Sequence, residues 1–171
     1  MNKKYRIIQI LLVLPLIFLA LWAINTNFPR NGQMTVKLNF NQSEPMVSKL
    51  GPEGRVKVVD NQAIIYDHPV YFDLRSMPWF NRAQIKITYL PNGRQLDGMA
   101  GQVGAGWQYD LIKPLMTKDV GEGYLEANFV FDLDKVYDQK NVRRFLIASS
   151  PLAHSADNEL KVKSIVIILN R

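Results

Sequence analysis

Aromatic side chains beside polar groups are the residues of this sequence best suited to bind a ligand. Trp79 and Phe80 lie together among turn-forming residues, shortly before Arg82. Trp107 and Tyr109 are separated by one polar residue, so they share one face of a predicted strand. Aromatic rings stack on the apolar faces of sugars while neighbouring polar groups form hydrogen bonds. These five residues are the candidate ligand-binding residues.

The same rings have a second interpretation, because large aromatic side chains dominate the cores of β-sandwiches. We favour a core position for Trp107 and Tyr109. The turn-like neighbours of Trp79 leave its position open between core and surface. Burial therefore decides between a binding surface and an ordinary core.

No arrangement of residues in the sequence predicts an active site. His68 and His154 lie far apart in predicted loops, without the spacing of a zinc-binding helix. Glycoside hydrolysis needs two carboxyl groups about 5–10 Å apart, but scattered acids such as Asp110 are typical of a solvated sandwich. Asp132 and Asp134 are also candidate ligands for a structural calcium ion, although such a pair alone does not define a site. We therefore expect a protein that is not an enzyme and needs no cofactor.

Glycine and charge patterns argue against nucleotides and nucleic acids as partners. Gly104 and Gly106 are followed by Tyr109 where a dinucleotide-binding fingerprint has its third glycine. The chain has 21 basic and 15 acidic residues, and four of the basic residues flank an N-terminal apolar segment. The remainder is close to neutral and predicts no basic patch for nucleic acid. There is no cysteine, so disulfides and thiolate chemistry are excluded.

The apolar segment of residues 7–24 predicts a transmembrane signal-anchor helix. A helix of this length spans about 27 Å, close to the hydrocarbon thickness of about 30 Å. Basic residues before it place residues 1–6 in the cytoplasm and the rest of the chain outside it. A cleaved signal peptide is the alternative, but the apolar run is longer than the usual core of such peptides.

Alternation of apolar and polar residues predicts an all-β domain over residues 33–171, after an Asn-, Pro- and Gly-rich linker at residues 25–32. The alternation is clearest in residues 33–40, 70–75, 83–89 and 125–131. Asp60 and Asn61 predict a hairpin turn, and a phase shift near Ser164 predicts a β-bulge. About nine short strands fit an antiparallel β-sandwich of the jelly-roll type.

The strand pattern resembles that of galactose-binding-like β-sandwiches, the jelly rolls common among carbohydrate-binding modules. Residues 70–75 and 82–89 are similar to the early strands of that fold, 124–133 and 142–151 to its middle pair, and 159–169 to its closing strand. The resemblance rests on strand lengths and patterns. It implies a fold and transfers no binding residue.

Together these features predict a single-pass membrane protein with an extracytoplasmic domain that binds a glycan or another polymer of the cell envelope. The alternative is a structural or assembly subunit of a membrane or envelope protein complex. A glycoside hydrolase is the third interpretation.

Overall fold

The computed structural model describes residues 13–19, 32–153 and 158–171. The chain divides into two units, Met1–Met34 and Thr35–Arg171. Residues 13–19 form a helix. Within the described ranges, no helix is long and apolar enough to cross a membrane. The cytoplasmic tail at 1–6, most of the predicted anchor at 7–24 and most of the predicted linker at 25–32 lie outside the described residues.

The described part of the domain consists of strands and one short 3-10 turn, η1 (Glu53–Arg55). The strands of the larger sheet are β1 (Gln33–Lys37), β2 (Val56–Val59), β3 (Gln62–Ile65), β5 (Arg82–Asn92), β8 (Met116–Gly121), β9 (Tyr124–Asp132) and β12 (Glu159–Asn170). The strands of the smaller sheet are β4 (Val70–Arg75), β6 (Arg94–Gln102), β7 (Tyr109–Ile112), β10 (Asp138–Gln139) and β11 (Val142–Pro151).

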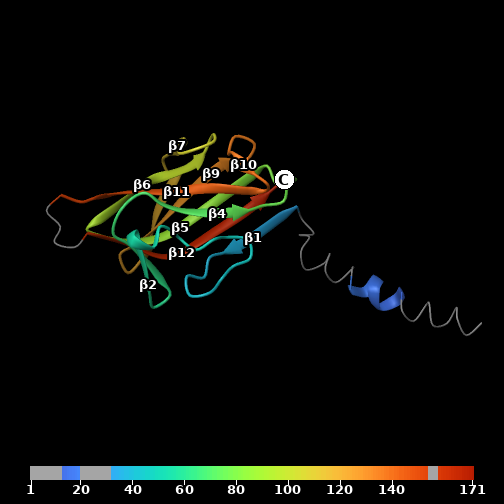
Figure 1. The fold of residues 1–171 in the computed structure, drawn as a ribbon. Helices are drawn as coiled ribbons and strands as arrows, with labels where there is room; N and C mark the ends of the chain where they lie inside the picture. Colours follow the sequence, from blue (N-terminus) through green and yellow to red (C-terminus); the bar gives the residue numbers. More distant parts are fainter. Residues whose placement is uncertain (1–12, 20–31, 154–157) are drawn as a thin grey trace, which may run out of the picture. The chain divides into compact units, whose positions relative to one another are not determined.

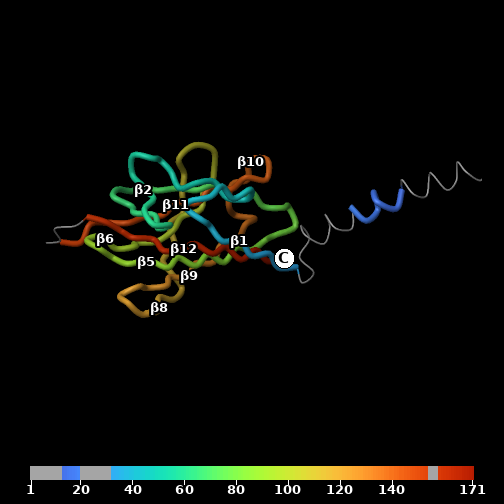
Figure 2. The backbone as a smooth tube through the Cα atoms, turned by 90° about the horizontal axis from the view of Figure 1, so that it is seen from below, coloured from blue at the N-terminus to red at the C-terminus, as the bar shows by residue number. Residues whose placement is uncertain are grey.

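These strands form two antiparallel sheets that pack face to face, which confirms the predicted β-sandwich (Figure 1). The larger sheet has the order β2-β3-β12-β5-β9-β8. In it, β1 also pairs with β12, and Figure 2 shows β1 running beside that strand. The smaller sheet has the order β10-β11-β6-β7, with β4 also paired with β11. Edge strands β7 and β8 follow each other in the chain, so this connection crosses from one sheet to the other.

Side chains from the inner faces of both sheets form the core. In residues 83–89 of β5 the apolar side chains, among them Ile85 and Ile87, are buried, while the polar residues between them are half-exposed. The Phe145 ring of β11 stacks on Phe72, with 5.7 Å between centroids, and meets Phe131 of the other sheet edge-on at 4.9 Å. Each fully buried side chain of this size contributes about 1.5–3 kcal/mol through the hydrophobic effect.

Two local features predicted from the sequence are confirmed. Asp60 and Asn61 both have positive φ angles, 50° and 59°, and join β2 to β3 in a two-residue hairpin. The pairing of β12 with β5 shifts register between Val162 and Ser164. This bulge lets the apolar residues on both sides of it face the core despite the phase shift in the sequence.

Arg94 is a buried cation that connects β6 to strand β11 and to two loops. Its side chain is 2% exposed and donates hydrogen bonds to the backbone oxygens of Tyr66 and Ser149, to the Ser149 hydroxyl and to the Asn158 side chain. Its Nη2 atom also lies 3.3 Å from Nδ1 of His68. These partners satisfy a buried guanidinium that would otherwise be costly to desolvate.

Replacing Phe129 with alanine should lower the free energy of unfolding by about 3–5 kcal/mol, because its ring is completely buried and would leave a cavity. Lys86→Ala is the matched control on the outer face of β5 and should change it by less than about 0.5 kcal/mol. Chemical denaturation measures both values. Similar losses for the two variants would contradict the assignment of inner and outer faces.

Candidate ligand-binding surface

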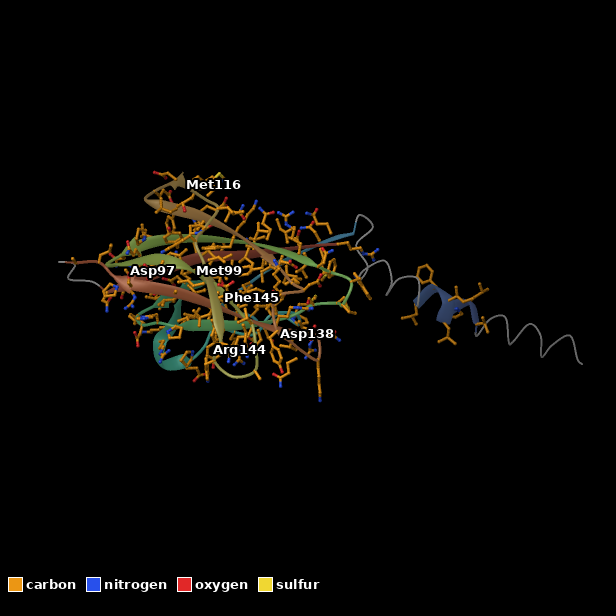
Figure 3. The ribbon with its side chains drawn as sticks, turned by 90° about the horizontal axis from the view of Figure 1, so that it is seen from above. Asp97, Met99, Met116, Asp138, Arg144 and Phe145 are labelled. Carbon is orange, nitrogen blue, oxygen red and sulfur yellow. The ribbon has the colours of Figure 1, made fainter. Side chains whose placement is uncertain are left out.

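The outer face of the smaller sheet brings together polar and aromatic residues from four strands. The antiparallel register places Arg144 of β11 opposite Asp73 of β4, two positions from Tyr71. Toward the β7 edge of the same sheet, Gln102 of β6 lies opposite Tyr109 of β7. Gln102 follows the buried Gly101. Tyr71, Asp73 and Arg144 each lie between buried neighbours, so their side chains project away from the core. Figure 3 shows this for β11, where Phe145 lies inside the sandwich and Arg144 on its outer side.

Trp107 extends from the loop between β6 and β7 and covers this face. Its side chain is 68% exposed. Its ring meets Tyr71 edge-on at 6.0 Å between centroids and lies 6.0 Å from the ring of Tyr109. We call this surface, formed by Tyr71, Asp73, Gln102, Trp107, Tyr109 and Arg144, the Trp107 face.

The expectation that Trp107 is a core residue is therefore wrong, and Tyr109 is only half-buried. The two rings do share one face, as their spacing predicts, but that face points to solvent. The reason is that β7 is an edge strand with exposed or half-exposed residues on both of its faces. Alternation cannot tell the inner from the outer face of such a strand.

The Arg144 side chain is held rigidly on this face. It donates two hydrogen bonds to the Asp73 carboxylate, from Nε at 2.7 Å and from Nη2 at 3.0 Å. Its guanidinium carbon also lies 4.7 Å from the centroid of the Tyr71 ring. The Asp73 hydrogen bond raises the pKa of Arg144 above its ordinary value. A bidentate pair that also stacks on a ring presents a fixed charge pattern to a ligand.

Tyr109 is half-buried on this face, and its hydroxyl oxygen is buried beneath the surface. Burial raises the pKa of Tyr109, and the nearby charge of Arg144 opposes that shift. The buried hydroxyl therefore stays protonated at neutral pH, and the ring of Tyr109 is the part of this residue that a ligand can reach.

A cavity of about 260 Å³ opens beside these groups. Its lining consists of Asp73, Gln102, Gly106, Trp107, Gln139, Val142 and Arg144. The side-chain amide of Gln102 donates hydrogen bonds to the backbone oxygens of Gly104, at 2.8 Å, and Gly106, at 2.7 Å. Gln102 thereby fixes the loop that carries Trp107.

This arrangement suits a polyhydroxylated ligand. The exposed indole offers a flat apolar surface, and the carboxylate, guanidinium and amides beside it can exchange hydrogen bonds with hydroxyl groups. The cavity is smaller than the usual range of about 300–1,000 Å³ for small-molecule sites. It therefore fits a short stretch of a polymer that continues across the open surface better than an enclosed ligand.

The other predicted binding residues lie elsewhere. Phe80 is 1% exposed and belongs to the core, so its selection as a binding ring is wrong. Trp79 is half-buried, with its ring 6.3 Å from that of Phe80 and 5.9 Å from the guanidinium carbon of Arg171. Arg82 is exposed at the start of β5 in the larger sheet. The five predicted residues thus belong to two separate regions: Trp107 and Tyr109 lie on the Trp107 face, and Trp79, Phe80 and Arg82 lie at or just before the start of β5.

Sequence reasoning missed Tyr71, Asp73, Gln102 and Arg144. Each occupies a polar phase of its strand, which predicts exposure and nothing more. They come together only through the registers of β4, β11, β6 and β7, and no local motif specifies those registers.

The predicted catalytic and metal candidates form ordinary local contacts. Asp132 accepts a hydrogen bond from the backbone N–H of Asp134 at 3.1 Å and lies 3.6 Å from the ammonium of Lys135. His68 is exposed beside Arg94, and His154 lies outside the described residues. Among the residues with described positions, no group of three or more His, Cys, Asp or Glu side chains could hold a metal ion.

No family model and no curated protein matches this chain. Among solved structures, it is similar to the enzymatically active domain of tailspike protein 4 from bacteriophage CBA120. That similarity has a TM-score of 0.35 and 8% sequence identity, and it covers 79% of this chain but only 19% of the tailspike chain. A similarity this weak gives no information about the function of the chain.

Gln102→Ala should loosen the loop that carries Trp107, because it removes two hydrogen bonds to that loop. We expect faster amide hydrogen exchange in residues 103–108 and a loss of about 1–2 kcal/mol in the free energy of unfolding. Gln84→Ala is the control, since its amide donates a hydrogen bond to Asn128 on the larger sheet. Unchanged exchange in residues 103–108 would contradict the role of Gln102.

Proposed function

We propose that this chain is a membrane-anchored binding module whose extracytoplasmic sandwich holds a glycan or another polymer of the cell envelope. The observation that carries the proposal is the Trp107 face. There an exposed indole lies beside two tyrosine rings and a bidentate ion pair on one sheet surface.

Exposure of Trp107 is the first supporting point. A tryptophan ring that is 68% exposed leaves apolar surface in water, and covering that surface with a ligand is favourable. Stacking on an aromatic ring adds about 0.5–1.5 kcal/mol to the gain from burial. Several weak contacts of this kind suit a long polymer, which binds through repeated units.

Preorganisation is the second supporting point. Asp73 and Arg144 satisfy each other without a ligand, and Gln102 holds the Trp107 loop. The carboxylate keeps further lone pairs and the guanidinium keeps further N–H donors for hydroxyl groups. A surface that needs little reordering loses little entropy on binding.

The proposed location follows from the N-terminal sequence. Residues 7–24 would span the membrane with residues 1–6 in the cytoplasm and residues 33–171 outside. The proposed fold type is the galactose-binding-like jelly roll, supported by the strand pattern of residues 70–75 and 82–89. A sugar-binding face on a sandwich of this type would meet envelope polymers directly.

Trp107→Ala should weaken retention on insoluble envelope polysaccharide by about tenfold, since stacking and apolar burial are both lost. The melting temperature should change little, because the side chain is mostly exposed. Tyr66→Ala removes another exposed ring, which follows β3, and should leave retention unchanged. Pull-down and thermal denaturation of the three proteins provide the comparison.

Equal retention of wild type and Trp107→Ala would contradict the glycan proposal. Release of soluble sugar that Asp110→Asn or Asp132→Asn abolishes would indicate a glycoside hydrolase.

A second candidate function is a structural or assembly subunit of an envelope complex. The observation that favours it is a set of exposed apolar side chains near edge strands β7 and β8: Leu111, Leu115 and Met116, of which Leu115 is 71% exposed. Such a patch suits a protein partner. Under this alternative, a photo-crosslinker at position 115 would capture a membrane protein, Leu115→Ser would abolish the crosslinked partner's co-purification, and no glycan would bind.

The proposed topology predicts that protease added to intact cells digests the sandwich while an N-terminal epitope tag stays protected. Disruption of the membrane should expose the tag. A tag cleaved in intact cells, or a sandwich protected in them, would contradict the orientation derived from the basic residues before Ile7.

A further inference from the structure

A separate cleft of about 750 Å³ lies on the outer face of the larger sheet. It forms where two strands pair with the same edge of β12 and leave a gap between them. β3 pairs with residues 160–162, whereas the chain after β1 resumes pairing at Ile165, whose backbone oxygen accepts a hydrogen bond from Leu38. The bulge residues Lys163 and Ser164 occupy the gap and line the cleft. We call it the bulge cleft.

Charged side chains of both signs line the bulge cleft. Lys37 and Lys163 supply positive charge, and Glu44, Asp60 and Glu126 supply negative charge. Side-chain amides and hydroxyls fill much of the remaining lining. The volume lies inside the range of about 300–1,000 Å³ that small-molecule sites occupy.

The ammonium of Lys163 lies against the aromatic ring of Tyr124 and, within the part of the chain that the structure describes, not against a carboxylate. The bulge turns Lys163 outward, and its ammonium lies 4.8 Å from the centroid of the Tyr124 ring. The Tyr124 hydroxyl donates a hydrogen bond of 3.4 Å to the side chain of Gln62, another lining residue. Among the described residues, no carboxylate forms an ion pair with Lys163 or Lys37. Both cations therefore remain available to an anionic group of a ligand.

The three acidic residues of the cleft differ in their availability to a ligand. Asp60 belongs to the rigid two-residue turn between β2 and β3. Glu126 forms an ion pair of 3.0 Å with Lys118 and is therefore largely neutralised. Asp60 and Glu44 enter no ion pair among the described residues, so they are the carboxylates available to a cation.

We propose that the bulge cleft binds a zwitterionic ligand, a short peptide with free ends, with its carboxylate at Lys163 and its ammonium toward Glu44 and Asp60. A polyanion would be repelled by the carboxylates, and a polycation by the lysines. A neutral sugar would leave both sets of charges without a partner. A peptide with free ends supplies a partner for both kinds of charge, and its amides can form hydrogen bonds with the amides and hydroxyls of the lining.

Titration of the isotope-labelled full-length protein with trialanine tests this proposal. Trialanine should shift the amide resonances of Gln62, Lys163 and Ser164. Acetylation of its amino end or amidation of its carboxyl end should each weaken binding by about tenfold, because each removes one charge-assisted interaction. Lys163→Gln should weaken trialanine binding by a similar factor and should abolish the preference for a free carboxyl end.

Lys86→Gln is the matched control, since Lys86 projects from the outer face of the same sheet but does not line the cleft. It should bind trialanine as the wild type does. The proposal is overturned if trialanine leaves the cleft resonances unchanged, if blocked and free peptides bind equally well, or if cellotriose shifts these resonances more than trialanine does. Loss of glycan binding in Trp107→Ala has no bearing on these outcomes, because that residue lies on the smaller sheet's surface.

Discussion

Each strand of this sandwich must bury one of its two faces, and that constraint determines where every other group can lie. The inner faces meet through rings such as Phe72, Phe131 and Phe145, and a charged side chain is buried only where it has hydrogen-bond partners. Charged side chains are therefore confined to the outer faces, to loops, or to fully hydrogen-bonded positions such as that of Arg94. With no cysteine in the chain, apolar burial and hydrogen bonds hold the domain together without disulfides.

Much of this arrangement can be predicted from the sequence, because alternation reports directly on which residues are buried. The strands around Ile87 and Phe129, the turn at Asp60 and the bulge at Ser164 all follow from local patterns. The Trp107 face does not. Its ion pair joins Asp73 and Arg144, which are 71 residues apart and meet only through sheet register. The exposure of Trp107 depends on β7 being an edge strand, which no local pattern reveals.

The two outer faces differ in how their cations are satisfied. Arg144 is neutralised by Asp73 on the Trp107 face, so this surface offers a ring and a compensated pair of charges. Lys163 rests against Tyr124 in the bulge cleft and keeps its charge for a ligand. Under the two proposals, the first surface would favour neutral, hydroxyl-rich molecules and the second would favour molecules that carry charges of their own. One small sandwich would thus present two chemically distinct surfaces, one on each sheet.

The most direct test of the proposed function maps where a soluble envelope oligosaccharide contacts the domain. The indole N–H resonance of Trp107 and the amide resonances of Tyr71, Gln102 and Arg144 should shift together as the oligosaccharide is added. The indole resonance of Trp79, which lies before β5, should not move. Shifts confined to other residues, or no shift in any resonance of the Trp107 face, would contradict the assignment of this surface as the binding site.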